Sequence, residues 1–176
     1  MTDNSTKKLV YMAFLTSLSI VLTRIFSIRI PLFGVEGVRI GFGGLPIIFT
    51  GIIFGPVAGG IVGAISDLVG YFINPMGAYM PHFTITAFLT GFIPAVLFHY
   101  IFNGKYNFWI LLTSIAAGQT ITSILLVPFF IHILFGAPFI PLLIPRLISG
   151  PIHMVLYAYL IKVIASRDFI KIPKRV

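Results

Sequence analysis

The sequence predicts an all-α integral membrane protein, a bundle of six transmembrane helices with both termini in the cytoplasm. Of its 176 residues, 58% are hydrophobic and only 9% are charged, and the mean hydropathy is +1.06. Soluble domains carry about 25% charged residues, so an ordinary soluble fold is excluded. Long apolar runs, of the length of about 20 residues that crosses a bilayer as a helix, recur along the chain. Residues 1–176 leave no room for a second domain and are expected to form a single transmembrane domain.

The first helix is expected at residues 9–28, after a polar lead and the pair Lys7-Lys8. Its apolar length suits a spanning helix better than a cleaved signal peptide, whose apolar core is about 7–15 residues. A glycine-rich loop is expected over residues 29–43. The next helix, at 44–54, is too short to cross the bilayer upright at about 1.5 Å per residue. It is expected either to be partly embedded or to extend into the preceding loop.

A glycine series marks the centre of the first half of the chain. Glycines stand at positions 51, 55, 59 and 63, and small residues at this spacing let membrane helices approach closely. Pro56 interrupts the series, which predicts two helices joined by a tight Gly55-Pro56 turn. The second of them is expected at 56–73.

Three further helices are expected at 81–101, 108–134 and 145–165. Asn-Pro and Met-Gly pairs mark a turn before the first of these. Pro94 and Pro128 are candidate bends. Residues 135–144 are interpreted as a proline-broken loop, and Pro145 suits the first position of the last helix.

The net charge of +8 follows the expected topology. Six helices place both ends on one side, and the positive-inside rule assigns that side to the cytoplasm. It would carry eight of the twelve Lys and Arg residues, so membrane topology explains the charge better than nucleic-acid binding. The other four fall at or near the outer side and depart from the rule: Arg24, Arg29, Arg39 and Arg146.

These outer arginines favour a site for an anionic ligand, because arginine binds carboxylates with two parallel hydrogen bonds. Anchoring to lipid headgroups is the alternative, above all for Arg29 and Arg39. Asp67 stands alone in an apolar helix, where a charged group usually faces a partner or a cavity. Three interpretations stay open for it: a structural ion pair with one of the arginines, a proton or cation site, or an acceptor for the donor edge of a ligand.

Other polar and aromatic residues are expected near the same cavity. Gln119 shares a helix face with Thr122 and Ser123, and these residues would either join helices or line a site. Tyr71 and Tyr79 would stack on an aromatic ligand or belong to an interfacial belt. His82 and His153 would line an outer cavity. The candidate ligand-binding residues are therefore Arg24, Arg39, Asp67, Tyr71, Tyr79, His82, Gln119, Arg146 and His153.

Several kinds of chemistry have no support in the sequence. There is no cysteine, and the histidines lack metal-ligand spacing. The chain has no phosphate-binding GxxxxGK[ST] loop, and GFGG at 41–44 lacks the spacing of a dinucleotide loop. No nucleophile and base form a convincing pair, so the protein is not expected to be an enzyme, and neither a metal nor a cofactor is expected.

Three stretches resemble a known family. They are VRIGFGGLPIIFTGIIFGPVAGGIVGAISDLVGYFINPMGAY, TAFLTGFIPAVLF and RLISGPIHMVLYAYLIK. Over nearly the whole chain they resemble the substrate-binding S components of energy-coupling factor (ECF) transporters, and most of all the folate-specific group. The pieces GFGGLP, GPxAG and SDLxGY are fairly specific for that group, although pantothenate and other vitamin binders share parts of them.

The resemblance implies a bundle that holds its ligand very tightly near the outer face, under the first loop, and does not transport alone. It implies a prokaryotic plasma membrane and two kinds of partner, a transmembrane coupling protein and two ABC-type ATPases that hydrolyse ATP. The family's AxxxA motif maps onto Ala13 and Ser17, with serine replacing the second alanine. S components are thought to topple in the membrane, and a smooth face of small residues would suit docking to the coupling protein.

Residue chemistry and the resemblance meet on folate as the ligand. Asp67 suits the donor edge of its pterin, the aromatic residues suit its central ring, and Arg24 or Arg146 suits its glutamate. The alternatives are an S component for another anionic vitamin such as pantothenate, a secondary transporter that uses Asp67 as a proton site, and a purely structural subunit.

Overall fold

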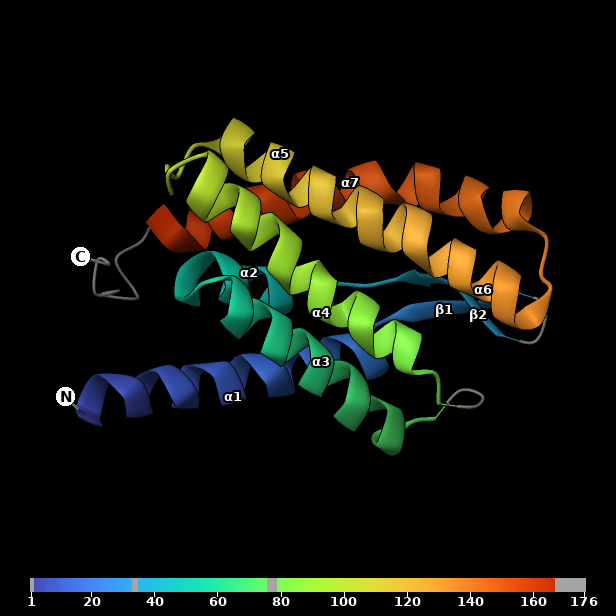
Figure 1. Cartoon of the computed structure of the whole chain (residues 1–176), viewed down its shortest axis with the longest axis horizontal. Coiled ribbons are helices and arrows are strands. Elements are labelled where there is room, and N and C mark those ends of the chain that lie inside the picture. The colour runs from blue at the N-terminus through green and yellow to red at the C-terminus, as the bar shows by residue number, and fades with distance from the viewer. Residues whose placement is uncertain (1, 33–34, 76–78, 167–176) are drawn as a thin grey trace.

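The computed structural model describes residues 2–32, 35–75 and 79–166, with side chains for residues 5–27, 41–75 and 79–165. Seven α-helices, two π-helical segments and one two-stranded hairpin follow one another along this part of the chain (Figure 1). In chain order the elements are α1 (Thr2–Arg24), β1 (Ile28–Leu32), β2 (Val35–Ile40), α2 (Gly44–Phe54), α3 (Pro56–Ile73), α4 (Pro81–Val96), η1 (Leu97–Ile101), α5 (Phe108–Gln119), η2 (Thr120–Leu126), α6 (Val127–Phe135) and α7 (Phe139–Ser166).

The helical membrane architecture predicted from the sequence is confirmed. Within the described residues, five apolar helical rods are long enough to cross a membrane, and α2 is a sixth, shorter one. Two rods combine several elements: α4 continues into η1, and α5, η2 and α6 form one rod of 28 residues. Asn107 caps this rod, because its side chain accepts a hydrogen bond from Trp109 N at 3.2 Å.

The loop expected over residues 29–43 is in large part a β-hairpin. β1 and β2 pair antiparallel, with residue 29 opposite residue 39, and α1 ends at Arg24 rather than at residue 28. Short alternating runs of β-branched residues, IRI and VRI, favour strands over coil here. The glycines and the proline of this segment led to the prediction of a loop in place of strands.

Glycines bring α2, α3 and α4 into backbone contact. α2 and α3 have the expected ranges and are joined at Gly55, whose φ of 101° favours glycine. A Cβ on Gly59 would lie 2.5 Å from Cα of Gly51 on α2 and 2.9 Å from the Gly91 carbonyl oxygen on α4. Gly91 completes this three-helix contact and was not predicted.

The predicted loop at 135–144 is wrong over its second half, because α7 begins at Phe139. Pro141 stands in the first turn, where backbone N–H groups have no partner within the helix. Pro145 and Pro151 lie inside α7, and membrane helices tolerate such prolines because neighbouring groups satisfy the freed carbonyls.

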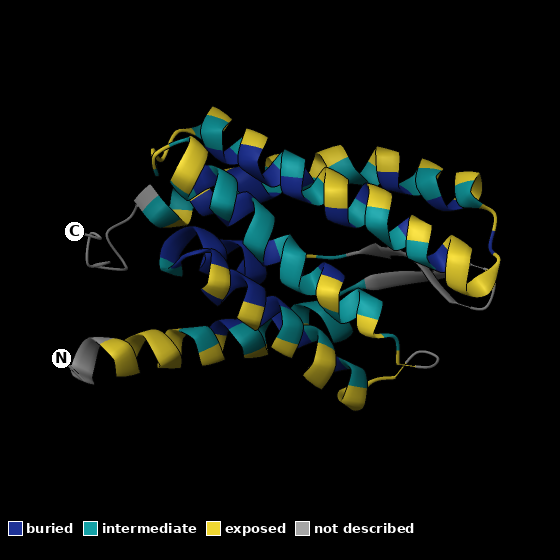
Figure 2. Ribbon diagram, viewed as in Figure 1, coloured by how far each residue is buried: buried dark blue, intermediate teal, exposed yellow. Residues whose placement is uncertain are grey.

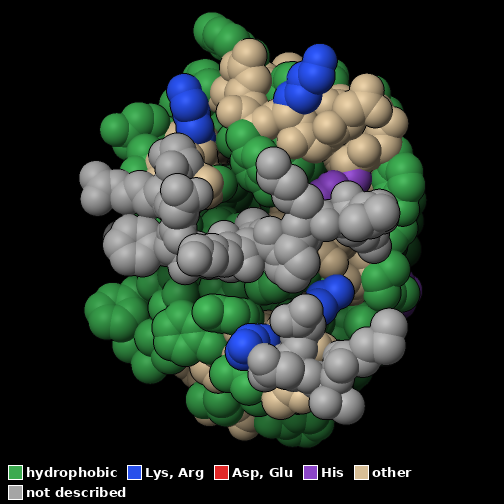
Figure 3. Space-filling model, turned by 90° about the vertical axis from the view of Figure 1, so that its left-hand side faces the viewer, with side chains coloured by type: hydrophobic (Ala, Val, Ile, Leu, Met, Phe, Trp, Pro, Cys, Tyr) green, Lys and Arg blue, Asp and Glu red, His purple; other side chains and the backbone are tan. Residues whose placement is uncertain are grey.

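The first described residues of α1 and the last of α7 lie at the same end of the molecule (Figure 1). In the view of that end, basic side chains are visible and no acidic side chain is seen among those described (Figure 3). The exposed lysines of the described chain are Lys7, Lys8, Lys105 and Lys162.

α2 lies at the centre of the bundle and is buried from Pro46 to Ile53 (Figure 2). Its apolar side chains join those of four other elements in a packed core near the end that holds the termini. This core consists of Leu15, Ile48, Phe49, Ile52, Ile53, Phe98, Leu111, Ile115, Tyr157, Ala158 and Ile161. The bundle is therefore closed on that side, and open space is left toward the opposite end.

Candidate ligand-binding site

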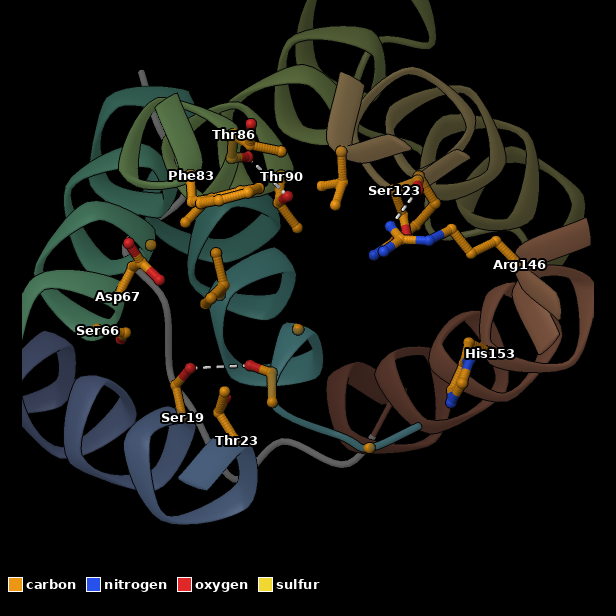
Figure 4. Close-up of a pocket in the computed structure, with 18 of the residues that line it drawn as sticks. Ser19, Thr23, Ser66, Asp67, Phe83, Thr86, Thr90, Ser123, Arg146 and His153 are labelled. Carbon is orange, nitrogen blue, oxygen red and sulfur yellow. Dashed lines mark hydrogen bonds between the residues drawn. The ribbon is translucent and has the colours of Figure 1, made fainter. Parts of the chain in front are cut away.

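A cavity of about 310 Å³ occupies the half of the bundle away from the termini. Such a volume lies at the lower end of the range of about 300–1,000 Å³ typical of small-molecule sites. Residues from α1, α3 and α4 form one wall, residues from α5, η2, α6 and α7 face them, and the segment 41–44 with the start of α2 closes the base. In Figure 4, Asp67 and Arg146 lie on opposite sides of this space.

The first wall carries an ion pair at the ends of α1 and α3. Arg24 Nη2 lies 3.7 Å from Asp67 Oδ1, and the two side chains are 6% and 20% exposed. The guanidinium also donates to the backbone carbonyls of Asp67 (3.4 Å) and Asn74 (3.2 Å). Gly70 makes room for it, because a Cβ there would lie 2.7 Å from Arg24 Nε. The sequence had left a structural ion pair open for Asp67, and the structure provides its partner.

The same carboxylate continues into a hydrogen-bond chain. Asp67 Oδ2 accepts from Thr84 Oγ1 at 2.8 Å, and Thr84 Oγ1 lies 2.9 Å from the Tyr79 hydroxyl. The Tyr79 ring packs on Tyr71 with centroids 5.2 Å apart. Since each carboxylate oxygen accepts about two hydrogen bonds, Asp67 retains capacity to accept from a ligand in the cavity.

The second wall is organised around Arg146. This residue is only 8% exposed, and its Nη1 donates to the Ser123 carbonyl at 2.9 Å. Figure 4 shows the guanidinium pointing into the cavity. His153 lies further along α7 in the same wall. Gln119 lines the cavity as well, whereas Thr122 is buried and bonds to the Gly118 carbonyl of its own helix.

The glycines of GFGG, at 41–44, are needed for close packing at the base of the cavity. Ser19 Oγ donates to the Gly43 carbonyl and Tyr157 hydroxyl donates to the Gly41 carbonyl, both at 2.8 Å. A side chain on Gly43 would overlap Thr23, and one on Gly44 would lie 3.3 Å from the Tyr157 ring. These glycines therefore let the segment sit tightly between α1 and α7, a role unrelated to nucleotide binding.

Only one face of α4 lines the cavity. Phe83, Thr86, Ala87 and Thr90 follow helical spacing and line the cavity. His82 was expected to line it too, but it precedes Phe83 by one position, about 100° around the helix. It does not line the cavity; its ring packs against Phe130 on α6 at 5.0 Å.

The structure brings most of the predicted site residues together. The cavity is lined by seven of them: Arg24, Asp67, Tyr71, Tyr79, Gln119, Arg146 and His153. Arg39 lies in β2, and its side chain is outside the described residues. Polar lining residues that were missed include Ser19, Thr23, Ser66, Thr86, Thr90 and Ser149. The spacing of Ser19 with Thr23, and of Thr86 with Thr90, placed each pair on one helix face and was the available signal.

Three charged side chains are found among the described residues that line the cavity. Among the described lining residues the charged ones are Arg24, Asp67 and Arg146, and Asp67 is paired with Arg24. Arg146 contributes a positive charge to the second wall, which favours an anionic group on a ligand. Among the described residues, no group of three His, Cys, Asp or Glu side chains could hold a metal ion.

Outside the cavity lining, α1 presents two small residues on its surface. Ala13 and Ser17 are both exposed, and Ser17 Oγ donates to the Ala13 carbonyl at 3.1 Å. The hydroxyl thus bonds to its own helix, so the side chains at these two positions are small and present little polar surface.

Comparison with known proteins gives a consistent result. The family described as ECF-type riboflavin transporter, S component, matches residues 3–167. The chain is 36% identical over 153 residues to the folate transporter FolT of Clostridium novyi (strain NT), which covers 87% of this chain and 84% of that protein.

Solved structures of S components are similar as well. The crystal structure of FolT bound with folic acid matches with a TM-score of 0.75 and 26% identity, over 90% of this chain and 96% of that chain. The S component for biotin from an ECF-type ABC transporter matches with a TM-score of 0.68 over 95% of each chain, and at 22% identity this likeness concerns the fold alone. By family match, sequence identity and fold, this multi-pass membrane protein belongs to the S components of ECF-type transporters.

Proposed function

We propose that this chain binds folate with high affinity in the cavity and delivers it for ATP-dependent uptake as part of an ECF-type ABC transporter. The observation that carries the proposal is the opposition of Asp67 and Arg146 across one cavity (Figure 4). Folate offers N–H donors at its pterin edge and carboxylates at its glutamate end. A ligand of this kind uses an acceptor on one wall and a cation on the other.

Each part of folate has a candidate partner. Asp67 accepts hydrogen bonds from the pterin, and Phe83, Tyr71 and Tyr79 provide aromatic surface for the rings. Arg146 binds a glutamate carboxylate. Arg24 is less suited to this last role, because its guanidinium is held by Asp67 and Asn74. The FolT relative and the structure with folic acid support the same ligand.

Riboflavin is the second candidate, since the matching family is described by that vitamin. Riboflavin carries no carboxylate and is uncharged at neutral pH. It would offer Arg146 only neutral acceptors, whereas a carboxylate of folate offers the stronger, charge-assisted hydrogen bonds. The charge of Arg146 therefore favours folate over riboflavin. The aromatic surface of the cavity favours folate over pantothenate, which has no aromatic ring.

The proposal extends to orientation and partners. The lysine-rich end with both termini faces the cytoplasm of a prokaryotic cell, as the positive-inside rule predicts, so the cavity opens outward. The chain acts as a single membrane-embedded binding domain. An energy-coupling membrane protein docks on α1 at Ala13 and Ser17, and two ABC ATPases supply the energy.

Analysis of the ligand that accompanies the purified protein tests this proposal. A ligand bound at nanomolar affinity often survives purification in detergent. Denaturation followed by mass spectrometry and ultraviolet absorbance is expected to release folate at about one molecule per protein. Recovery of riboflavin or pantothenate would replace the proposed ligand, and a protein that is empty and binds none of the three vitamins would contradict the proposed function.

A further inference from the structure

A carbonyl oxygen in the cavity wall lacks the donor that a regular helix provides. In the π segment η2, backbone N–H groups bond five residues back instead of four. At its end, Val127 N–H donates to the carbonyl of Thr122. In that register the carbonyl of Ser123 would accept from residue 128, but residue 128 is proline and has no N–H.

Arg146 takes the place of the missing donor. Its Nη1 reaches from α7 to the Ser123 carbonyl at 2.9 Å. This contact is partly buried in the cavity wall, so the Ser123 carbonyl provides a directional anchor for the guanidinium. The contact orients the guanidinium, and Figure 4 shows the remainder of the group facing the cavity.

We propose that Pro128 is a positioning residue for the ligand site: by withholding a backbone N–H, it reserves the Ser123 carbonyl for Arg146 and aims the guanidinium at the ligand. Pro128 itself is buried and does not line the cavity. Its influence on the ligand passes through Ser123 and Arg146. The inference rests on the proposed function, in which Arg146 binds a carboxylate of folate.

The substitution Pro128→Ala supplies the missing N–H and lets the helix reclaim the Ser123 carbonyl. Folate affinity, measured by isothermal titration calorimetry in detergent, is expected to fall about tenfold, the size of one hydrogen bond to a charged group. Affinity for the diamide of folic acid, which has no negative carboxylate, is expected to change much less. The apparent melting temperature should change little, because the gain of a backbone N–H and the loss of the buried proline ring oppose each other.

Two controls separate positioning from a general effect of losing a proline. Pro151 is also inside a helix, but its side chain is exposed and does not line the cavity, so Pro151→Ala should leave folate affinity unchanged. In an Arg146→Ala background, Pro128→Ala should have no further effect, because the two substitutions act on one interaction. Pro128→Gly also restores the N–H and should repeat the result of Pro128→Ala.

The outcomes distinguish this inference from the proposed function. If Arg146→Ala weakens folate binding but Pro128→Ala does not, or if Pro128→Ala acts equally in both backgrounds, the role of Pro128 is wrong and the proposed function stands. If Arg146→Ala binds folate like the unmodified protein, the carboxylate assignment and this inference both fail. Loss of folding in both Pro128 variants would assign the residue to folding instead.

Discussion

Asp67 has partners on two other helices, Arg24 on α1 and Thr84 on α4. Its carboxylate therefore holds the first wall together in addition to facing the cavity. The substitution Asp67→Asn leaves the 6%-exposed Arg24 without its counter-charge. We expect folate affinity to fall at least about tenfold, through loss of a charged acceptor, together with a lower melting temperature in detergent.

A matched variant separates the two roles of Asp67. Thr84→Val removes the hydrogen bond to Oδ2 and keeps both charges. It should lower stability slightly and change folate affinity much less than Asp67→Asn does. If Asp67→Asn lowers the melting temperature while folate affinity stays within about twofold, a change of about 0.4 kcal/mol, Asp67 is a structural residue only.

The sequence predicted the identity of these residues better than their contacts. Isolated charges in apolar helices are expensive to insert, so Arg24, Asp67 and Arg146 stood out, and all three line the cavity. Which arginine pairs with Asp67 depends on how α1 lies against α3, and no pattern along the chain contains that information. The role of the Ser123 carbonyl could not be predicted either. It is a backbone group, and its lack of a helical partner depends on the hydrogen-bond register of η2.

At the scale of elements, the close contact of α2, α3 and α4 depends on glycine. A methyl group at Gly59 meets the backbone of both neighbours, Gly51 and Gly91. Backbone cannot move aside as a side chain can, so Gly59→Ala is expected to destabilise the protein by about 1–3 kcal/mol, as overpacking typically does. Thermal unfolding in detergent measures the effect.

Gly150 on α7 provides the control for this substitution. A Cβ there would lie 3.4 Å from the end of the Ile124 side chain, which is ordinary contact. Gly150→Ala should therefore be neutral or slightly stabilising, since alanine favours a helix over glycine. Equal destabilisation by both substitutions would show that glycine is not required for the α2–α3–α4 contact.

Elements with strong apolar periodicity and a clear stop signal were predictable. Gly55-Pro56 ended one helix and began the next, and the structure has the turn at that place. The hairpin and the start of α7 were missed, because proline and glycine were interpreted as loop signals in both segments. Neighbouring structure decides such cases: β1 gains its hydrogen bonds from β2, and α7 packs against α5 and η2.

For the whole molecule, the proposed ligand site and the proposed docking surface involve different residues. The cavity lies in the half of the bundle away from the termini, whereas Ala13 and Ser17 lie on the exposed face of α1. Neither Ala13 nor Ser17 is among the residues that line the cavity. Binding and transport should therefore be separable, which neither a secondary transporter nor a structural subunit predicts.

The double variant Ala13→Phe/Ser17→Phe tests this separation. Both side chains are exposed and neither lines the cavity, so we expect folate affinity within about twofold of the unmodified protein. ATP-dependent folate uptake by cells or by vesicles with the coupling protein and ATPases should be lost, because two large rings prevent close approach of another helix. Ser17→Ala, which keeps the face small, and Ile152→Phe, at an exposed site on α7, should both preserve uptake.

Uptake that survives in the double variant would place the docking surface elsewhere. Folate accumulation in vesicles that contain this chain alone would replace the coupled mechanism with secondary transport.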